Sequence, residues 1–314
     1  MKAIVLKDFG GADQLVIRDL PKPVIKENEV LIKAHAIALN PVDVKTRNGK
    51  GQAAKLKNED PMILGWDVSG IIEATGSAVT KFSKGDEVFG MINLPGAGKA
   101  YAEFVAAPQE HIILKPSKIT HEAAAAASLA AMTAWQALVD QAEIKSGQKI
   151  LIHAASGGVG HYAVQIAKHF GAYVIGTSSA ENKSFVLSLG ADQHIDYRSV
   201  KFEEVSPHVD IVLETIGGEN IDRSLKVLKE GGTIVSLPSG VSETVAEKAA
   251  AQNKKGIFFF VHSDAGDLQQ LAALLENGKL LSHVSQRFSF EEISKAHALL
   301  ESGKAKGKLV LTPP

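Results

Sequence analysis

The stretch that most constrains the fold is "LIHAASGGVGHYAVQIAKHFGAYVIGTSS", residues 151–179. An apolar run leads into a glycine-rich turn, a helix-like segment follows, and a second apolar run closes the unit. Two strands joined through a helix lie parallel, and the crossover between them is right-handed. The stretch therefore predicts a βαβ unit inside a parallel sheet.

The turn itself matches the dinucleotide fingerprint G-x-G-x-x-G/A, with Ala155 in the first glycine position. We expect Gly157 to let the backbone approach a pyrophosphate and Gly160 to let the helix pack closely on the strand. The amides at the start of the helix would face the phosphates. The alternative is a glycine turn that holds no ligand. The predicted coenzyme-binding residues of the turn are Ser156, Gly157, Gly158, Val159 and Gly160.

The end of the second apolar run indicates which dinucleotide binds. Enzymes that use NAD usually place an Asp or Glu there, against the ribose 2'-hydroxyl. This chain has Ser178 and Ser179 instead, with Lys183 one turn further on and Tyr197 at the end of the next apolar run. Hydroxyl, ammonium and phenol groups can donate to a 2'-phosphate, so we predict NADPH. The alternative is that the serines cap a helix and Lys183 lies in solvent.

The pattern changes along the chain. Residues 1 to 120 hold short β-rich runs separated by Gly, Pro and Asp turns, which favours a mostly antiparallel, barrel-like domain. From Thr120, a possible helix N-cap, strands and helices alternate, which is typical of a doubly wound parallel sheet. The fold class we expect is α/β, with a β-barrel domain beside the parallel sheet.

Composition excludes several classes of function. The 314 residues are 45% hydrophobic and 22% charged, with a formal net charge of -1 and no cysteine. This balance gives no basic footprint for nucleic acid or an anionic membrane, and it excludes disulfides and cysteine-ligated metals. The start lacks a signal-peptide pattern, and the Ala-rich tract at 123–140 is interrupted by Ser, Thr and Gln, as in a buried helix. We expect a cytoplasmic protein with small neutral partners.

Four segments resemble the medium-chain dehydrogenase/reductase family: "ALNPVDVKTRNG", "LGWDVSGIIEATGSAVTKFSKGDEVFG", "AASGGVGHYAVQIAK" and "GKLVLTP". The resemblance covers essentially the whole chain and is closest to the zinc-independent quinone oxidoreductases and enone reductases. It implies a GroES-like catalytic domain made of residues 1–121 and 264–314, with a Rossmann domain at 122–263. It also implies a homodimer, and the run "GIFFFVH" at 256–262 predicts that the dimer forms along the last Rossmann strand.

The resemblance also bears on metal binding. The positions where zinc-dependent relatives carry their catalytic ligands fall at Asn40, Trp66 and about Leu129, none of which suits zinc. We therefore expect no metal. Without it, alcohol oxidation loses the stabilisation of an alkoxide, whereas hydride transfer to a quinone or enone leaves a delocalised charge that hydrogen bonds can stabilise.

The same resemblance supplies the remaining candidate site residues, each with an alternative. Asn40 and Lys45 are predicted hydrogen-bond or proton donors to the acceptor. The alternatives are that Asn40 does no more than fix a turn before Pro41 and that Lys45 lies in solvent. Trp66 is predicted to line the pocket or pack in the core, and Thr133 to approach the nicotinamide ribose or pack in a helix. Lys308 near the C-terminus is predicted to reach the coenzyme phosphates or to lie in solvent. Leu237 and Ser239 are predicted to reach the coenzyme because they follow a parallel strand, where ligands of open α/β sheets bind.

The predicted function is NADPH-dependent reduction of quinones or α,β-unsaturated carbonyl compounds. Two alternatives stay open because fold alone does not settle function. One is a catalytically weak NADPH-binding protein that acts as a sensor or partner module. The other is the RNA-binding role found among some animal relatives, against which the near-neutral charge speaks.

Overall fold

The structure is a computed structural model that describes residues 1–206 and 208–314. It divides into two compact units, the first made of Met1–Met132 and His262–Pro314 and the second of Thr133–Val261. The second unit begins later than the expected residue 122, inside helix α3 (His121–Trp135). The reason is packing, because Ala125 and Ala126 of that helix are buried against Ala36, Ala38 and Val310 of the first unit.

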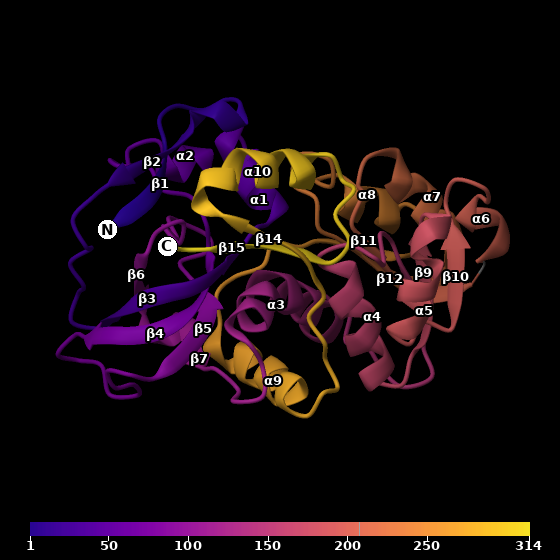
Figure 1. The fold of residues 1–314 in the computed structure, drawn as a ribbon. Coiled ribbons are helices and arrows are strands. Elements are labelled where there is room, and N and C mark those ends of the chain that lie inside the picture. Colours follow the sequence, from indigo (N-terminus) through magenta and orange to yellow (C-terminus); the bar gives the residue numbers. More distant parts are fainter. Residues whose placement is uncertain (207) are drawn as a thin grey trace. The chain divides into compact units, whose positions relative to one another are not determined.

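The first unit is built on a mixed sheet whose strands come from both ends of the chain (Figure 1). The C-terminal strand β15 pairs antiparallel with β3, and Val310 lies opposite Ala38. Only β14 and β15 run parallel within this sheet, and β1 and β2 form a separate antiparallel pair. The strands of the unit are β1 (Lys2–Leu6), β2 (Leu15–Asp19), β3 (Glu29–Ala38), β4 (Asp67–Thr75), β5 (Glu87–Met91), β6 (Phe104–Pro108), β7 (Ile112–Leu114), β14 (Val284–Ser289) and β15 (Lys308–Thr312).

Helices of the first unit begin where the sequence supplies caps. Ala123 donates its N–H to the Thr120 hydroxyl (3.2 Å), which confirms the expected cap of α3. The Ala-rich tract is buried as predicted, and none of the helices in the described residues is long and apolar enough to span a bilayer. The helices are α1 (Pro41–Arg47), α2 (Ala53–Leu56), α3, α9 (Ala265–Glu276) and α10 (Ile293–Glu301).

The second unit is a six-stranded sheet in which every pair of neighbours is parallel, as the alternating pattern predicted. Its order is β10-β9-β8-β11-β12-β13. This is the doubly wound order, in which the chain adds β9 and β10 on one side of β8 and then β11, β12 and β13 on its other side. The strands are β8 (Lys149–Ile152), β9 (Tyr173–Ser178), β10 (Gln193–Asp196), β11 (Val209–Glu214), β12 (Leu228–Ser236) and β13 (Lys255–Phe258), and the helices are α4 (Gly160–His169), α5 (Lys183–Ser188), α6 (Phe202–Val205), α7 (Glu219–Val227) and α8 (Val245–Ala250). Ligands of such sheets bind at the carboxyl ends of the two strands where the order of addition changes side, here β8 and β11.

The edge strand β13 differs in one respect from the expectation. It does occupy the edge of the sheet, but it ends at Phe258, so the three phenylalanines do not all belong to a strand. Phe258 is 38% exposed, whereas Phe259 is buried at 8%. Phe258 is therefore the exposed ring at the end of this edge strand, and the half-buried Phe260 lies beyond it.

Candidate functional site

The glycine turn between β8 and α4 is shaped by backbone contacts that exclude a side chain. A Cβ atom at Gly160 would stand 2.2 Å from the Ala154 carbonyl oxygen, and one at Gly157 would stand 3.2 Å from the same atom. The turn is tied to β9 because Ala155 donates its N–H to the Thr177 carbonyl oxygen (2.8 Å). The residues Ser156, Gly157, Gly158 and Val159 are half-buried there. The close contact at Gly160 explains why the turn needs a glycine there, and the coenzyme role of the turn stays a prediction.

The two serines after β9 already have partners. The Ser178 hydroxyl, 3% exposed, lies 2.7 Å from His194 Nε2 and donates to the Ser179 carbonyl oxygen. The Ser179 hydroxyl donates to Glu181 (2.9 Å) and accepts from the Asn182 amide (3.1 Å). Both hydroxyls therefore hold the strand end in shape, and a phosphate bound there would have to compete with these contacts.

Of the cationic and phenolic groups expected beside these serines, Lys183 begins α5 and Tyr197 follows β10. β10 pairs in parallel with β9, and Tyr197 donates its N–H to the Ser178 carbonyl oxygen (3.3 Å). Lys183 is exposed and close enough to His194 to contribute to lowering its pKa, after the larger effect of burial. The sequence interpretation missed Arg198, whose guanidinium lies 5.6 Å from the Tyr197 ring centroid and is exposed. Its position directly after Tyr197 was the available signal.

Two further positions predicted to reach the coenzyme follow β12. Leu237 donates its N–H to the Glu214 carbonyl oxygen (3.0 Å), so this segment is tied to the end of β11. Both Leu237 and Ser239 are half-buried. They therefore lie at the carboxyl edge of the parallel sheet, where the sequence placed them.

In the first unit, a buried carboxylate gathers residues from four segments. Asp67, at the start of β4, is 0% exposed and accepts from the Asn40 amide (2.8 Å) and from the Leu129 N–H (2.9 Å). The Lys308 ammonium, 3% exposed, lies 3.7 Å from the same carboxylate and donates to the Leu39 carbonyl oxygen (2.9 Å) and to Asn40 Oδ1. Because an ammonium only donates and a carboxylate accepts, the orientation of the Asn40 amide is fixed. We call Asn40, Asp67, Leu129 and Lys308 the Asp67 cluster.

This geometry favours a structural role for two of the predicted site residues, Lys308 and Asn40, and for Asn40 that role is the turn-fixing alternative. Lys308 was expected to reach the coenzyme, but its ammonium is buried and its donors are used by Leu39, Asn40 and Asp67. Asn40 was expected to donate to the acceptor, but it is 1% exposed and its amide is held by Asp67. Both residues instead fix the start of α1, where Asp43 accepts from the Asn40 N–H (2.5 Å).

Trp66 has the second of its two predicted roles, packing in the core. Its side chain is 0% exposed and its indole N–H donates to the Gly96 carbonyl oxygen (2.9 Å), so it packs in the core and does not line a pocket. Lys45 lies on α1 and is half-buried. Thr133, in α3, is 6% exposed. Of the four predicted catalytic residues, Lys45 therefore has the most accessible side chain.

Burial controls the ionisation of this region. Desolvation raises the pKa of Asp67 to about 6 although Lys308 and Asn40 oppose the shift, and it raises the pKa of Asp43 to about 7. Burial also lowers the pKa of Lys308 and lowers that of His297 to about 3. The sequence interpretation missed Asp43 and Asp67, although both lie inside motifs it had singled out, "NPVD" and "GWD".

Comparison with known proteins agrees with this architecture. The model for the alcohol dehydrogenase GroES-like domain matches residues 26–117, and the model called zinc-binding dehydrogenase matches residues 189–311. A 2-methylene-furan-3-one reductase of Solanum lycopersicum is 38% identical over 324 residues, covering 100% of this chain and 79% of that protein. The chain belongs to the medium-chain dehydrogenase/reductase family.

Other members of the family are similar at comparable levels. The NADPH-dependent alkenal/one oxidoreductase of Arabidopsis thaliana, chloroplastic, is 38% identical and covers 100% of this chain and 80% of its own length. The quinone oxidoreductase of Homo sapiens is 32% identical, covering 99% and 97%. The solved structure of the quinone oxidoreductase from Coxiella burnetii superimposes with a TM-score of 0.95 at 41% identity, covering 99% of both chains. These likenesses extend over both units.

Family membership raises the question of whether the Asp67 cluster could hold a catalytic zinc ion. The sequence resemblance places the zinc-ligand positions of metal-dependent members at Asn40, Trp66 and about Leu129. In this structure Asn40 and Leu129 both donate to Asp67, and Trp66 precedes it in the chain. Since the Asp67 carboxylate is balanced by the Lys308 ammonium and the indole is bound to Gly96, this donor set does not fit a tetrahedral zinc ion.

Proposed function

We propose that this protein is an NADPH-dependent oxidoreductase that transfers hydride to quinones or α,β-unsaturated carbonyl compounds. The observation that carries the proposal is the carboxyl edge of the parallel sheet, where the glycine turn and the exposed Lys183, Tyr197 and Arg198 occur together. The named relatives support the same conclusion, because they include an NADPH-dependent alkenal/one oxidoreductase and quinone oxidoreductases.

The residues of the second unit fit the coenzyme. The turn at 156–160 leads into the first turn of α4, where helix N–H groups can donate to a pyrophosphate, and the Gly160 position has no room for a side chain. Lys183, Tyr197 and Arg198 supply a 2'-phosphate with two positive charges and a phenol. When bound, NADPH supplies the hydride, and the protein supplies orientation and electrostatics.

Residues of the first unit suit an acceptor whose negative charge is delocalised. Lys45 is the proposed donor to the acceptor oxygen, because the other predicted donor, Asn40, is committed to Asp67. The capping contact between Asn40 and Asp43 holds the start of the helix on which Lys45 lies. The Asp67 cluster thus positions α1 without touching the acceptor.

The experiment that tests the function is an NADPH-consumption screen across quinones, alkenals and cyclic enones. We expect turnover with at least one class, and Lys45→Met should lower kcat by about tenfold to a hundredfold while leaving the NADPH KM close to that of the wild type. Lys50→Met, which removes an exposed lysine after α1, is the matched control and should behave as the wild type. NADPH binding without turnover on any acceptor would favour the sensor alternative.

Zinc independence is a second expected result. Purified protein should contain less than about one tenth of a zinc ion per chain, and chelators should leave its activity intact, because the ligand positions carry Asn40, Trp66 and Leu129. Metal content is measured by mass spectrometry on the dialysed protein. Stoichiometric zinc that is lost together with activity would contradict this assignment.

A homodimer along β13 is a third expected result. An exposed edge strand with an exposed aromatic ring invites pairing with a second copy. We expect light scattering at micromolar concentration to give twice the chain mass for the wild type and the single chain mass for Phe258→Glu. Tyr173→Glu, at a 44% exposed ring elsewhere in the unit, should stay dimeric. A monomeric wild type would refute the proposal.

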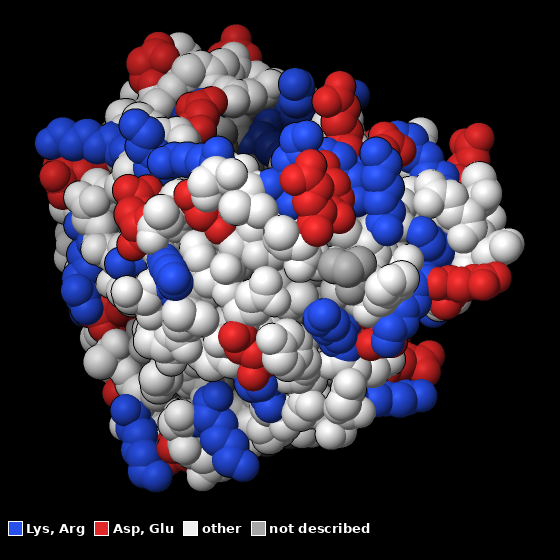
Figure 2. Space-filling view, turned by 90° about the vertical axis from the view of Figure 1, so that its right-hand side faces the viewer, with Lys and Arg blue, Asp and Glu red and all other residues white. Residues whose placement is uncertain are grey.

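Charge gives no support to the RNA-binding alternative. Figure 2 shows one face of the molecule, on which Lys and Arg side chains alternate with Asp and Glu and form no continuous basic area. The formal net charge of -1 agrees with that distribution. A cytoplasmic location stays a prediction made from the sequence.

A further inference from the structure

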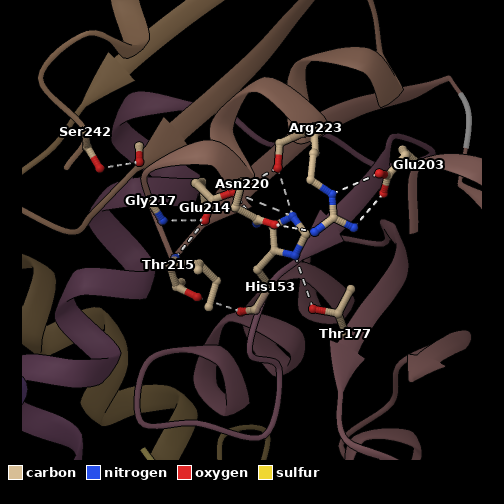
Figure 3. Close-up of polar contacts among 12 residues, drawn as sticks. His153, Thr177, Glu203, Glu214, Thr215, Gly217, Asn220, Arg223 and Ser242 are labelled. Atoms are coloured by element: carbon tan, nitrogen blue, oxygen red, sulfur yellow. Dashed lines mark hydrogen bonds and ion pairs between the residues drawn. The ribbon is translucent and has the colours of Figure 1, made fainter. Parts of the chain in front are cut away.

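A buried hydrogen-bond chain connects the carboxyl ends of three strands of the second unit (Figure 3). His153 follows β8, Thr177 is in β9, and Glu214 ends β11. Their exposed fractions are 2%, 3% and 0%. None of these three side chains belongs to the coenzyme contacts proposed above. His153 lies three residues before the turn at 156–160, Thr177 is near the end of β9, and the Glu214 carbonyl oxygen accepts from the Leu237 N–H after β12.

Each side chain of this hydrogen-bond chain lies within hydrogen-bond distance of the next. His153 Nδ1 lies 3.2 Å from the Thr177 hydroxyl, and His153 Nε2 lies 3.0 Å from the Ser224 hydroxyl. Ser224, on α7 and 0% exposed, donates to Glu214 Oε2 (2.8 Å). The imidazole also packs edge-on against Phe202, with ring centroids 4.6 Å apart.

The Glu214 carboxylate is surrounded by donors. Oε1 accepts from the N–H groups of Ile216 (2.7 Å) and Gly217 (3.0 Å), and Oε2 accepts from the Asn220 amide (2.8 Å) as well as from Ser224. A buried carboxylate with four donors accepts in every contact, so the single Ser224 proton points toward it. The carboxylate also shapes the turn after β11 through those two backbone contacts.

The direction of the remaining hydrogen bonds follows. Because the Ser224 proton goes to Glu214, the Ser224 oxygen accepts from His153, which must carry its proton on Nε2. His153 Nδ1 then accepts from the Thr177 hydroxyl. Burial lowers the pKa of His153, in agreement with a neutral ring. Every donor in this hydrogen-bond chain therefore points in the same direction, from Thr177 in β9 toward Glu214 at the end of β11.

We infer that the chain Thr177–His153–Ser224–Glu214 is a positioning network for the coenzyme, which holds the turns after β8, β9 and β11 at one fixed spacing. The glycine turn starts three residues after His153, and Ser178 directly follows Thr177. The Thr215 hydroxyl adds a tie by donating to the His153 carbonyl oxygen (2.9 Å). The inference rests on the proposed binding of NADPH at this edge of the sheet.

The first test measures the direction of the chain and needs no coenzyme. Nitrogen-15 NMR of the full-length protein at neutral pH should show His153 as the neutral Nε2–H tautomer. Glu214→Gln puts an amide donor opposite Ser224, which reverses the chain and should move the His153 proton to Nδ1. An imidazolium ring, or an Nδ1–H tautomer in the wild type, would overturn the assignment.

The second test measures coenzyme affinity by titration calorimetry with NADPH. Thr177→Val removes the first donor with little change in shape, and we expect the Kd for NADPH to rise about fivefold, the worth of one net hydrogen bond. Thr177→Ser keeps the hydroxyl and should restore the wild-type Kd. Ser224→Ala, which interrupts the chain away from the turns, should act in the same direction as Thr177→Val.

The matched control breaks a contact between β8 and β11, which the network also connects, at the opposite ends of these two strands. Asp210, in β11, accepts from the N–H of Lys149, the first residue of β8 (2.8 Å). Asp210→Ala, which removes the acceptor of this contact, should lower the Tm but leave the Kd for NADPH unchanged. Unchanged affinity in both Thr177→Val and Ser224→Ala would overturn the inference while leaving the proposed function intact. A wild type that binds no NADPH would instead refute the proposed function.

Discussion

Replacing Lys308 with methionine is expected to lower the free energy of unfolding of the first unit by about 3–5 kcal/mol, because it leaves the Asp67 carboxylate buried without its countercharge. Lys308 and Asp67 are 3% and 0% exposed, so water does not replace the lost ammonium. The change is measured by urea denaturation at pH 8, above the pKa of about 6 of Asp67, so that the wild type contains the ionised carboxylate. Loss of Lys308 raises this pKa further, because the ammonium lowers it.

A double variant shows whether the buried charge pair accounts for the loss of unfolding free energy. Asp67→Asn combined with Lys308→Met removes both charges, and the double variant should be more stable than Lys308→Met alone. Lys115→Met is the matched control, since Lys115 is also buried but its partner Glu87 is 48% exposed, and its loss should cost about 1 kcal/mol or less. Strictly additive losses in the double variant would contradict the coupling.

The Lys183→Ala variant is expected to raise the KM for NADPH by about tenfold or more and to leave kcat nearly unchanged. A charge-assisted hydrogen bond to a phosphate contributes about 1.5–3 kcal/mol, and the lower end applies because Lys183 is exposed. The 2'-phosphate is remote from the nicotinamide, so binding changes and chemistry does not. NADH kinetics should hardly move, because NADH carries no 2'-phosphate.

Both coenzymes are to be measured with one quinone. For the wild type we expect NADPH to exceed NADH by at least about a hundredfold in kcat/KM, through the combined contributions of Lys183, Tyr197 and the adjacent Arg198. Lys226→Ala, at an exposed lysine of α7 in the same unit, is the control and should change neither coenzyme. Equal use of NADH and NADPH by the wild type would show that these residues bind no phosphate, and so would an equal loss of both in Lys183→Ala.

The sequence by itself determined the parallel sheet, its glycine turn and the position of Ser178 and Tyr197 at the ends of neighbouring strands. These features are local, because a βαβ unit and its turn are encoded within a single short stretch, as at 151–179. Family resemblance extended this to the two-domain architecture. The end of β13 at Phe258 was misjudged because a run of apolar residues does not reveal where pairing with a neighbouring strand stops.

Only the tertiary structure decided the roles of Asn40, Trp66 and Lys308. Residues 40, 67, 129 and 308 are distant in the chain, and their convergence depends on β15 returning to pair with β3. A lysine near a C-terminus reads as solvated until a buried carboxylate is found beside it. The physical reason is that charge pairing and desolvation depend on distances in space, whereas periodicity and turn chemistry depend on neighbours along the chain.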